Sequence, residues 1–421
     1  MSLRFIALFL LLPVVLPGAE KKIADRLLES ARNGNVTSQV ELAAQYFTGT
    51  NRPVNPSLGA YWFRKAAESG NAVARYNYAL CCLSGWGVKK SPQTAFLWLE
   101  RAAGQRFIPA QIKHAELLFN GVAAEESDEY RFPQIPADPE SALKTLRKLA
   151  VSGDWTASGT LARLLLSDTA NLEKNAAEIR AAAKFADSKN KGDTEITLLY
   201  ATVLQNGIGG ASDMKTAAKL LHRIAEKSPE AMAQLAEFYQ FGFGVEPDQK
   251  KALELTRKAA ASGSPRAKIA LGNRYLEGDM VQHDPAEAFR LFEEAWQTGY
   301  PRSASVLGKC CLNGIGTRQD ISRAFELFLM GANAGDPESQ YQLALCFMNG
   351  TGTGRDLKSG AYWMEVASKS SHIESIREFA ICLLEGKGVA ADRKKAIDLL
   401  RIAASKGDVK SVELLNETVV R

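Results

Sequence analysis

Residues 310–325, CCLNGIGTRQDISRAF, place two adjacent cysteines before a Gly-x-Gly turn and an expected helix start. A Gly-x-Gly turn that opens a helix can hold a phosphate, and adjacent thiols can serve redox chemistry or bind a metal. A phosphate loop also needs the G-K-[ST] signature, which is missing here. Because the Gly-x-Gly motif occurs six times in the chain, we interpret it as a tight turn between two helices that requires positive φ.

The six cysteines all lie three or four residues before a turn glycine, so we expect them on equivalent helices of a repeat. Matching residues of stacked helices lie roughly 8–10 Å apart, beyond the ~7 Å Cα limit for a disulfide. Neighbouring residues of one helix point about 100° apart, so adjacent cysteines should not bridge either. We therefore expect buried, reduced thiols and no disulfide, and a metal site only if adjacent helices converged. The cysteines are Cys81, Cys82, Cys310, Cys311, Cys346 and Cys382.

No constellation of catalytic residues stands out, and the sequence contains neither H-E-x-x-H nor C-x-x-C. His114 occupies a position that is apolar in other units, so we interpret it as a hydrogen-bonded core residue. The other three histidines fall in unrelated contexts. The acidic stretch EESDE, residues 125–129, is interpreted as a solvated loop or a contact for a basic partner. We predict no catalytic residue, no metal site and no cofactor.

The turn glycines recur at a fixed interval, which indicates a repeat array. From Gly242 onward, the first glycine of the turn returns every 36 residues, at positions 278, 314, 350 and 386. Glycines at positions 49, 85 and 121 keep the same interval. We therefore expect each turn to join the two helices of one unit, and neighbouring units to stack around a shared core.

Each unit follows one pattern of residue types. A small residue lies six positions before the turn glycine and a bulky one three before, as Ala344 and Phe347 do before Gly350. Spacings of three and four residues share one face of a helix, so these side chains should pack against a second helix. After the turn, an Asp such as Asp320 caps the second helix, and an Ala such as Ala324 follows four residues later.

This pattern, L-G/A-x-x-Y-x-x-G-x-G-V-x-x-D-x-x-x-A…A-A-x-x-G, resembles the Sel1-like repeat, a relative of the tetratricopeptide repeat. Residues 232–263 and 343–370 carry the resemblance well. The resemblance implies an all-α fold, a right-handed α-solenoid of about ten helix-turn-helix repeats over residues 36–407.

Four segments depart from the regular unit. One unit contains an insertion at 122–140, and the unit at 155–192 has Ser167 in place of the turn glycine. Segments 20–35 and 408–421 are expected to be N-terminal and C-terminal capping helices, because a stacked array otherwise exposes its apolar ends.

The first residues have the layout of a secretory signal peptide. Arg4 precedes an apolar stretch over residues 5–16, and cleavage after Ala19 would remove residues 1–19. The stretch is too short for a membrane span, which needs roughly 20 residues, so we expect no stable span after cleavage. An uncleaved anchor or a buried first helix is the alternative. The prediction is an exported protein, periplasmic or extracellular.

The resemblance also implies a binding surface. In tetratricopeptide units, the ligand-facing positions of the first helix lie twelve, nine, five and two residues before the turn glycine. If this carries over, a concave groove binds a protein or peptide partner. The expected partner-binding residues are Glu230, Glu237, Arg266, Asn273, Arg302, Lys309, Glu338, Tyr341 and Arg377.

The sequence therefore predicts a non-catalytic, exported scaffold or adaptor for protein–protein interaction. The alternative is an enzyme that acts on cell-wall or other extracellular substrates, and a third interpretation is an endoplasmic-reticulum adaptor. The formal charge is only +5 and no basic run is present, so nucleic-acid binding is not expected.

Overall fold

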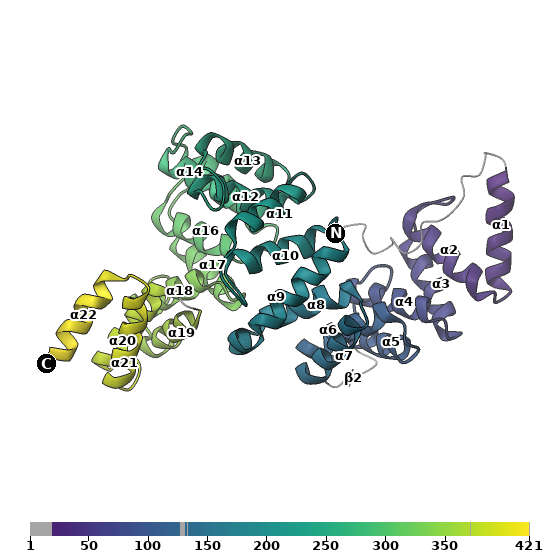
Figure 1. Ribbon diagram of the computed structural model, residues 1–421, viewed down its shortest axis with the longest axis horizontal. Helices are drawn as coiled ribbons and strands as arrows, with labels where there is room; N and C mark the ends of the chain where they lie inside the picture. Colours follow the sequence, from purple (N-terminus) through teal and green to yellow (C-terminus); the bar gives the residue numbers. More distant parts are fainter. Residues whose placement is uncertain (1–18, 127–130, 133, 371, 421) are drawn as a thin grey trace. The chain divides into compact units, whose positions relative to one another are not determined.

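The computed structural model describes residues 19–126, 131–132, 134–370 and 372–420. The signal-peptide prediction for residues 1–19 therefore lies outside the described residues except for Ala19. Contacts divide the chain into two compact units, which meet in sequence between Asp213 and Met214. Within each unit, consecutive helices pack against one another in antiparallel pairs (Figure 1). This arrangement is that of an α-solenoid, as the repeat predicted.

Unit 1 comprises ten helices, a short 3-10 turn and one β-hairpin in its described residues. They are α1 (Ala19–Arg32), α2 (Val36–Thr48), α3 (Pro56–Glu68), α4 (Ala72–Ser84), α5 (Pro92–Gly104), α6 (Ile108–Asn120), β1 (Glu125–Glu126), β2 (Arg131–Phe132), α7 (Pro139–Val151), α8 (Trp155–Ser167), the 3-10 turn Thr169–Asn171, α9 (Leu172–Lys189) and α10 (Thr194–Gln205).

Unit 2 is helical throughout its described residues. Its elements are α11 (Met214–Ile224), the 3-10 turn Ala225–Lys227, α12 (Pro229–Phe241), α13 (Gln249–Ala261), α14 (Pro265–Glu277), α15 (Pro285–Trp296), α16 (Arg302–Asn313), α17 (Ile321–Asn333), α18 (Pro337–Asn349), α19 (Leu357–Lys369), α20 (Ile373–Glu385), α21 (Arg393–Ser405) and α22 (Val409–Val420).

The first glycine of each turn ends the first helix of its unit. Gly314 adopts φ 68° and donates its backbone N–H to the Cys310 carbonyl, which closes α16. A residue without Cβ takes this left-handed conformation at little cost. Asp320 then begins α17, where its side chain accepts the backbone N–H of Arg323. The turn and cap therefore have the roles that the sequence predicted.

The second glycine allows neighbouring units to touch. A Cβ built on Gly316 would lie 1.9 Å from the carbonyl oxygen of Pro285, the first residue of α15 in the preceding unit. Gly388 stands in the same relation to Leu357, also at 1.9 Å. The place that a phosphate would occupy is thus filled by the backbone of the neighbouring repeat. The Gly-x-Gly motif is an inter-repeat contact.

The small position of the first helix receives a phenylalanine from the second. A Cβ on Gly272 or Gly308 would approach Phe292 or Phe328 within 2.4 and 2.5 Å respectively. Both rings are fully buried, and rings of this size contribute most of the apolar area in such a core. The close approach of the two helices explains why the position tolerates only Gly or Ala.

The two irregular regions of unit 1 differ from the helical pattern in different ways. The insertion at 122–140 forms a small β-hairpin, in which β1 pairs with β2 and Val122 bridges Ile135. The hairpin is a local exception within the all-α fold, confined to the insertion, where the inserted backbone pairs its own hydrogen-bonding groups. Part of the EESDE stretch lies outside the described residues. In the unit at 155–192, Asp168 follows α8, and a 3-10 turn leads into α9 without a left-handed cap.

Candidate functional site

All nine predicted groove residues lie in unit 2, on the first helices of five successive repeats: α12, α14, α16, α18 and α20. We call this set of positions, twelve, nine and five residues before the turn glycine, the A-helix face. Its side chains are mostly half-buried, but Asn273 and Arg302 are exposed and Arg377 is buried.

Charged pairs connect this face from one repeat to the next. Arg266 binds Glu237 of the preceding repeat through two hydrogen bonds of 2.7 Å, from Nε and Nη2 to the two carboxylate oxygens. Lys309 Nζ lies 2.6 Å from Glu338 Oε1 of the following repeat. Both pairs join the position five before one glycine to the position twelve before the next. We call each such pair a rung.

A second set of links uses residues that cap three of the first helices: Ser264, His372 and Asp408. The cap Ser264 donates its hydroxyl to Glu230 at 2.8 Å, and His372 Nε2 lies 3.0 Å from Glu338 Oε2. Arg377 Nη1 donates to Asp408 Oδ1 at 2.7 Å. The predicted groove residues are thus largely engaged in contacts between repeats.

The contacts around Glu338 change its acidity. Hydrogen bonding to His372, and then to Lys309 and Gln342, lowers the pKa of the Glu338 carboxyl to about 2. Tyr341, one turn further along α18, packs its ring 5.1 Å from the His372 ring, and burial raises its pKa. Glu338 is therefore a charged junction of three repeats.

One rung has no internal counter-charge. By register, Asn273 and Arg302 occupy the two positions that Glu237 and Arg266 occupy one repeat earlier. Within the described residues, neither side chain has a hydrogen bond or ion pair, and both are exposed. We call this pair the open rung.

The sequence interpretation missed the cap residues of this face. The sequence pattern groups His372 with no other histidine, and it does not single out Ser264 or Asp408. Ser264 and His372 lie fourteen residues before a turn glycine, and Asp408 lies one 36-residue interval after His372, at the position where the backbone N–H groups of the first helix need a side-chain acceptor. The capping position, together with the 36-residue length of the repeat, is the sequence signal that identifies these three residues.

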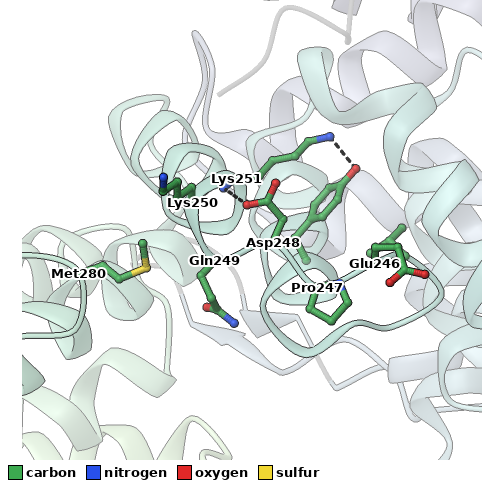
Figure 2. Close-up of a pocket in the computed structure, with 9 residues that line it drawn as sticks. Glu246, Pro247, Asp248, Gln249, Lys250, Lys251 and Met280 are labelled. Atoms are coloured by element: carbon green, nitrogen blue, oxygen red, sulfur yellow. Dashed lines mark hydrogen bonds between the residues drawn. The ribbon is translucent and has the colours of Figure 1, made fainter.

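A second polar site lies at the turn between α12 and α13. Figure 2 shows an open hollow there, lined by residues 245–251, Tyr239 and Met280. Lys251 Nζ donates to the Tyr239 hydroxyl at 2.7 Å, and that hydroxyl lies 2.9 Å from His222 Nε2. A hollow of the same register, lined by Cys311, residues 317–321 and Arg323, occurs two repeats later. The hollow is therefore a feature of the repeat.

The six cysteines are buried, as their positions predicted, and all are free thiols. Burial raises the pKa of Cys81 to about 12 and that of Cys310, Cys346 and Cys382 to about 11. Thiols with such pKa values are poor nucleophiles at neutral pH. Among the described residues, no group of three or more His, Cys, Asp or Glu side chains is arranged to hold a metal ion.

His114 is half-buried in unit 1, with its ring centroid 4.4 Å from that of Phe96. Burial lowers its pKa, so the imidazole is neutral at pH 7. Its Nε2 is buried without a hydrogen-bond partner within the described part of the chain. The sequence interpretation of His114 as a hydrogen-bonded core residue is thus met only in part, because the side chain is half-buried and its Nε2 has no hydrogen bond.

In the described residues, four helix pairs of unit 1, from α2–α3 to α8–α9, and five of unit 2, from α12–α13 to α20–α21, define a helical repeat protein. The model of the family described as Sel1 repeat matches eight stretches: residues 36–71, 72–106, 198–228, 229–264, 265–295, 301–336, 337–372 and 375–408. Because these stretches cover more than half of the chain, it belongs to the Sel1 repeat family. A long stretch without a match, 107–197, contains the hairpin and the unit that lacks the turn glycine.

Several known proteins are similar to this chain. An uncharacterised protein of Neisseria meningitidis serogroup B is 25% identical over 235 residues, which are 56% of this chain and 38% of the relative. A protective antigen of uropathogenic Escherichia coli with an SLR fold is 22% identical, with a TM-score of 0.47 over 94% of this chain and 82% of that one. A Sel1 repeat protein of Oxalobacter formigenes is 23% identical, with a TM-score of 0.46 over 63% and 99%.

The fold sets the general class of function. Sel1 repeats build scaffolds that generally serve protein–protein interaction, because stacked repeats expose long surfaces to partners. In the described part of the chain, no helix combines the length and the apolar character that a membrane crossing requires.

Proposed function

We propose that this protein is a non-catalytic scaffold that binds a protein or peptide partner on the A-helix face of unit 2. The observation that carries the proposal is the open rung. Contacts between repeats hold the neighbouring side chains of the face in place, whereas Asn273 and Arg302 remain exposed. Fixed surroundings lower the entropy that a partner loses on binding, and Arg and Tyr side chains are frequent energetic centres of interfaces.

The rival hypothesis, an enzyme acting on cell-wall or other extracellular substrates, has less support. Its best candidate is the Lys251–Tyr239–His222 cluster beside the hollow of Figure 2. Because an equivalent hollow recurs two repeats later, the geometry of the repeat accounts for it without a reaction.

A steric block tests the location of binding. Asn273→Trp places a large ring on the A-helix face, whereas Glu326→Trp places the same ring on an exposed position of the second helix α17. We expect Asn273→Trp to weaken capture of the native partner at least about tenfold, because the large ring would occupy the space that the partner contacts. Glu326→Trp should capture the partner as wild type does. Equal capture by both variants would refute binding on this face.

We also propose that the protein is exported to the periplasm or the extracellular medium. The support is the apolar stretch after Arg4 and the small residues before the expected cleavage site at Ala19. Mass spectrometry of the protein from the extracytoplasmic fraction should find an N-terminus at Glu20. Full-length protein confined to the cytoplasm would contradict export.

A further inference from the structure

We propose that the open rung binds a carboxylate side chain of the partner, so that the A-helix face is selective for an acidic peptide segment. This inference rests on the proposed function, because it names the chemistry of a partner bound on the same face.

The register shows what the open rung lacks. In the preceding rung, the guanidinium of Arg266 meets both carboxylate oxygens of Glu237 at 2.7 Å. In the following rung, Lys309 meets Glu338. Arg302 occupies the place of Arg266, but its opposite position holds the uncharged Asn273. The missing group is therefore a carboxylate.

No nearby acidic side chain supplies that carboxylate. By register, the closest candidate is Asp336, the cap of α18. Asp336 is buried, and its Oδ2 accepts the backbone N–H of Ser339 at 2.9 Å and the Ser339 hydroxyl at 2.6 Å. Glu338 is engaged with Lys309 and His372. The guanidinium of Arg302 thus faces solvent with its donors available.

The surrounding charges favour a carboxylate over the phosphates of a nucleic acid. A guanidinium presents a planar pair of donors that fits a carboxylate, and the Asn273 amide adds a further donor. Nucleic-acid binding instead needs a run of cations along a backbone. Glu237 and Glu338 interrupt any such run on this face, because each already neutralises the cation next to it.

Peptide libraries test the inference on the full-length protein. The probes are two fluorescein-labelled pools of nine-residue peptides with random flanks, one with a central Glu and one with a central Gln. We expect wild type to retain the Glu pool about tenfold better than the Gln pool, the discrimination typical of one charge-assisted pair. Arg302→Gln should abolish this preference. Arg318→Gln, which removes another exposed arginine of the same repeat, should preserve it.

Asn273→Glu is the decisive second variant, because it recreates the Glu237–Arg266 rung and gives Arg302 an internal partner. It should abolish the preference for the Glu pool while Arg302 is still present. Equal retention of both pools by wild type, equal loss in Arg302→Gln and Arg318→Gln, or an unchanged preference in Asn273→Glu would each overturn the inference.

Binding of a fluorescein-labelled single-stranded oligonucleotide tests whether the open rung prefers a nucleic acid to an acidic peptide. If the oligonucleotide binds more tightly than the Glu pool and its binding depends on Arg302, the acidic-peptide inference is wrong.

The proposed function has a separate test. If Asn273→Trp blocks binding of the native partner but Arg302→Gln does not, the A-helix face binds a partner that is not recognised through a carboxylate.

Discussion

At the scale of single residues, Gly316 illustrates how the repeat limits its own sequence. Its φ of 68° is left-handed, and a Cβ at this position would meet the carbonyl oxygen of Pro285. Backbone cannot move aside as a flexible side chain can, so a methyl group would have to separate two repeats. The turn glycines are thus fixed by packing between units as well as by their own conformation.

Gly316→Ala should therefore lower the free energy of unfolding by about 3 kcal/mol, from overpacking and left-handed strain together. Urea unfolding followed by circular dichroism measures the change. Gly354→Ala is the matched control, because a Cβ there meets nothing within 4 Å and its φ is not left-handed. It should change the free energy by no more than about 0.5 kcal/mol. Similar losses in both variants would contradict the packing role of Gly316.

The cysteines lead to a second prediction at this scale. Because all six thiols are buried with raised pKa values where a shift is resolved, a thiol reagent at pH 8 should label almost none of them in the folded protein. All six should react once urea unfolds the chain. Rapid labelling of the folded protein, or fewer than six reactive thiols after unfolding without reductant, would contradict buried, reduced cysteines.

At the scale of helices, the rungs distribute stabilising contacts along the A-helix face. A double-mutant cycle with Arg266→Ala and Glu237→Ala should give a coupling free energy of about 1–2 kcal/mol, because the pair is bidentate and half-buried. The same cycle with Arg302→Ala and Asn273→Ala should give a value near zero. A large coupling free energy in the second cycle would show that Arg302 and Asn273 already interact with each other, which would contradict an open rung.

The junction at Glu338 makes stability depend on pH. Its pKa is lowered from 4.5 to about 2, so its contribution is present above about pH 4.5 and is lost as the pH falls toward 2. Wild type should exceed Glu338→Gln in urea midpoint at pH 6, and the gap should shrink between pH 5 and pH 2. Glu326→Gln, an exposed control, should show no such trend. A gap that widens on acidification would contradict the lowered pKa.

The fold was predictable from sequence because the same pattern of residue types recurs in each regular repeat. The glycine interval, the small residue before it and the Asp after it specify a helix, a turn and a second helix without knowledge of the tertiary contacts. The hairpin at 122–140 was not predictable in this way, because it follows no repeated rule. In the unit with Ser167, the helices form without the glycine, since packing of α8 against α9 replaces the cap as the ordering contact.

The candidate site was predictable only in part. Periodicity places Arg266, Arg302 and Lys309 on one face, but it does not say which of them have partners. That depends on the residue 29 positions away in the neighbouring repeat, as in Arg266–Glu237 and Lys309–Glu338. His372 shows the same limit, because its contact with Glu338 spans 34 residues. The distinction between a structural charge and an available one therefore required the structure.

At the scale of the whole molecule, the chain is a scaffold of stacked Sel1 repeats. The helix pairs are held together by turn glycines, buried rings and charged rungs. Among the predicted groove residues, the exposed ones are those of the open rung. The proposed recognition surface is therefore the A-helix face of unit 2.

Site-specific photo-crosslinking in the native compartment tests this claim most directly. A photoreactive amino acid is placed singly at Asn273, Arg302 or Tyr341 on the A-helix face, and at Arg318 or Glu326 as exposed controls. The account predicts covalent adducts with a common protein from the three face positions and none from the controls. Adducts that form only from the control positions, or equally from all five, would contradict it.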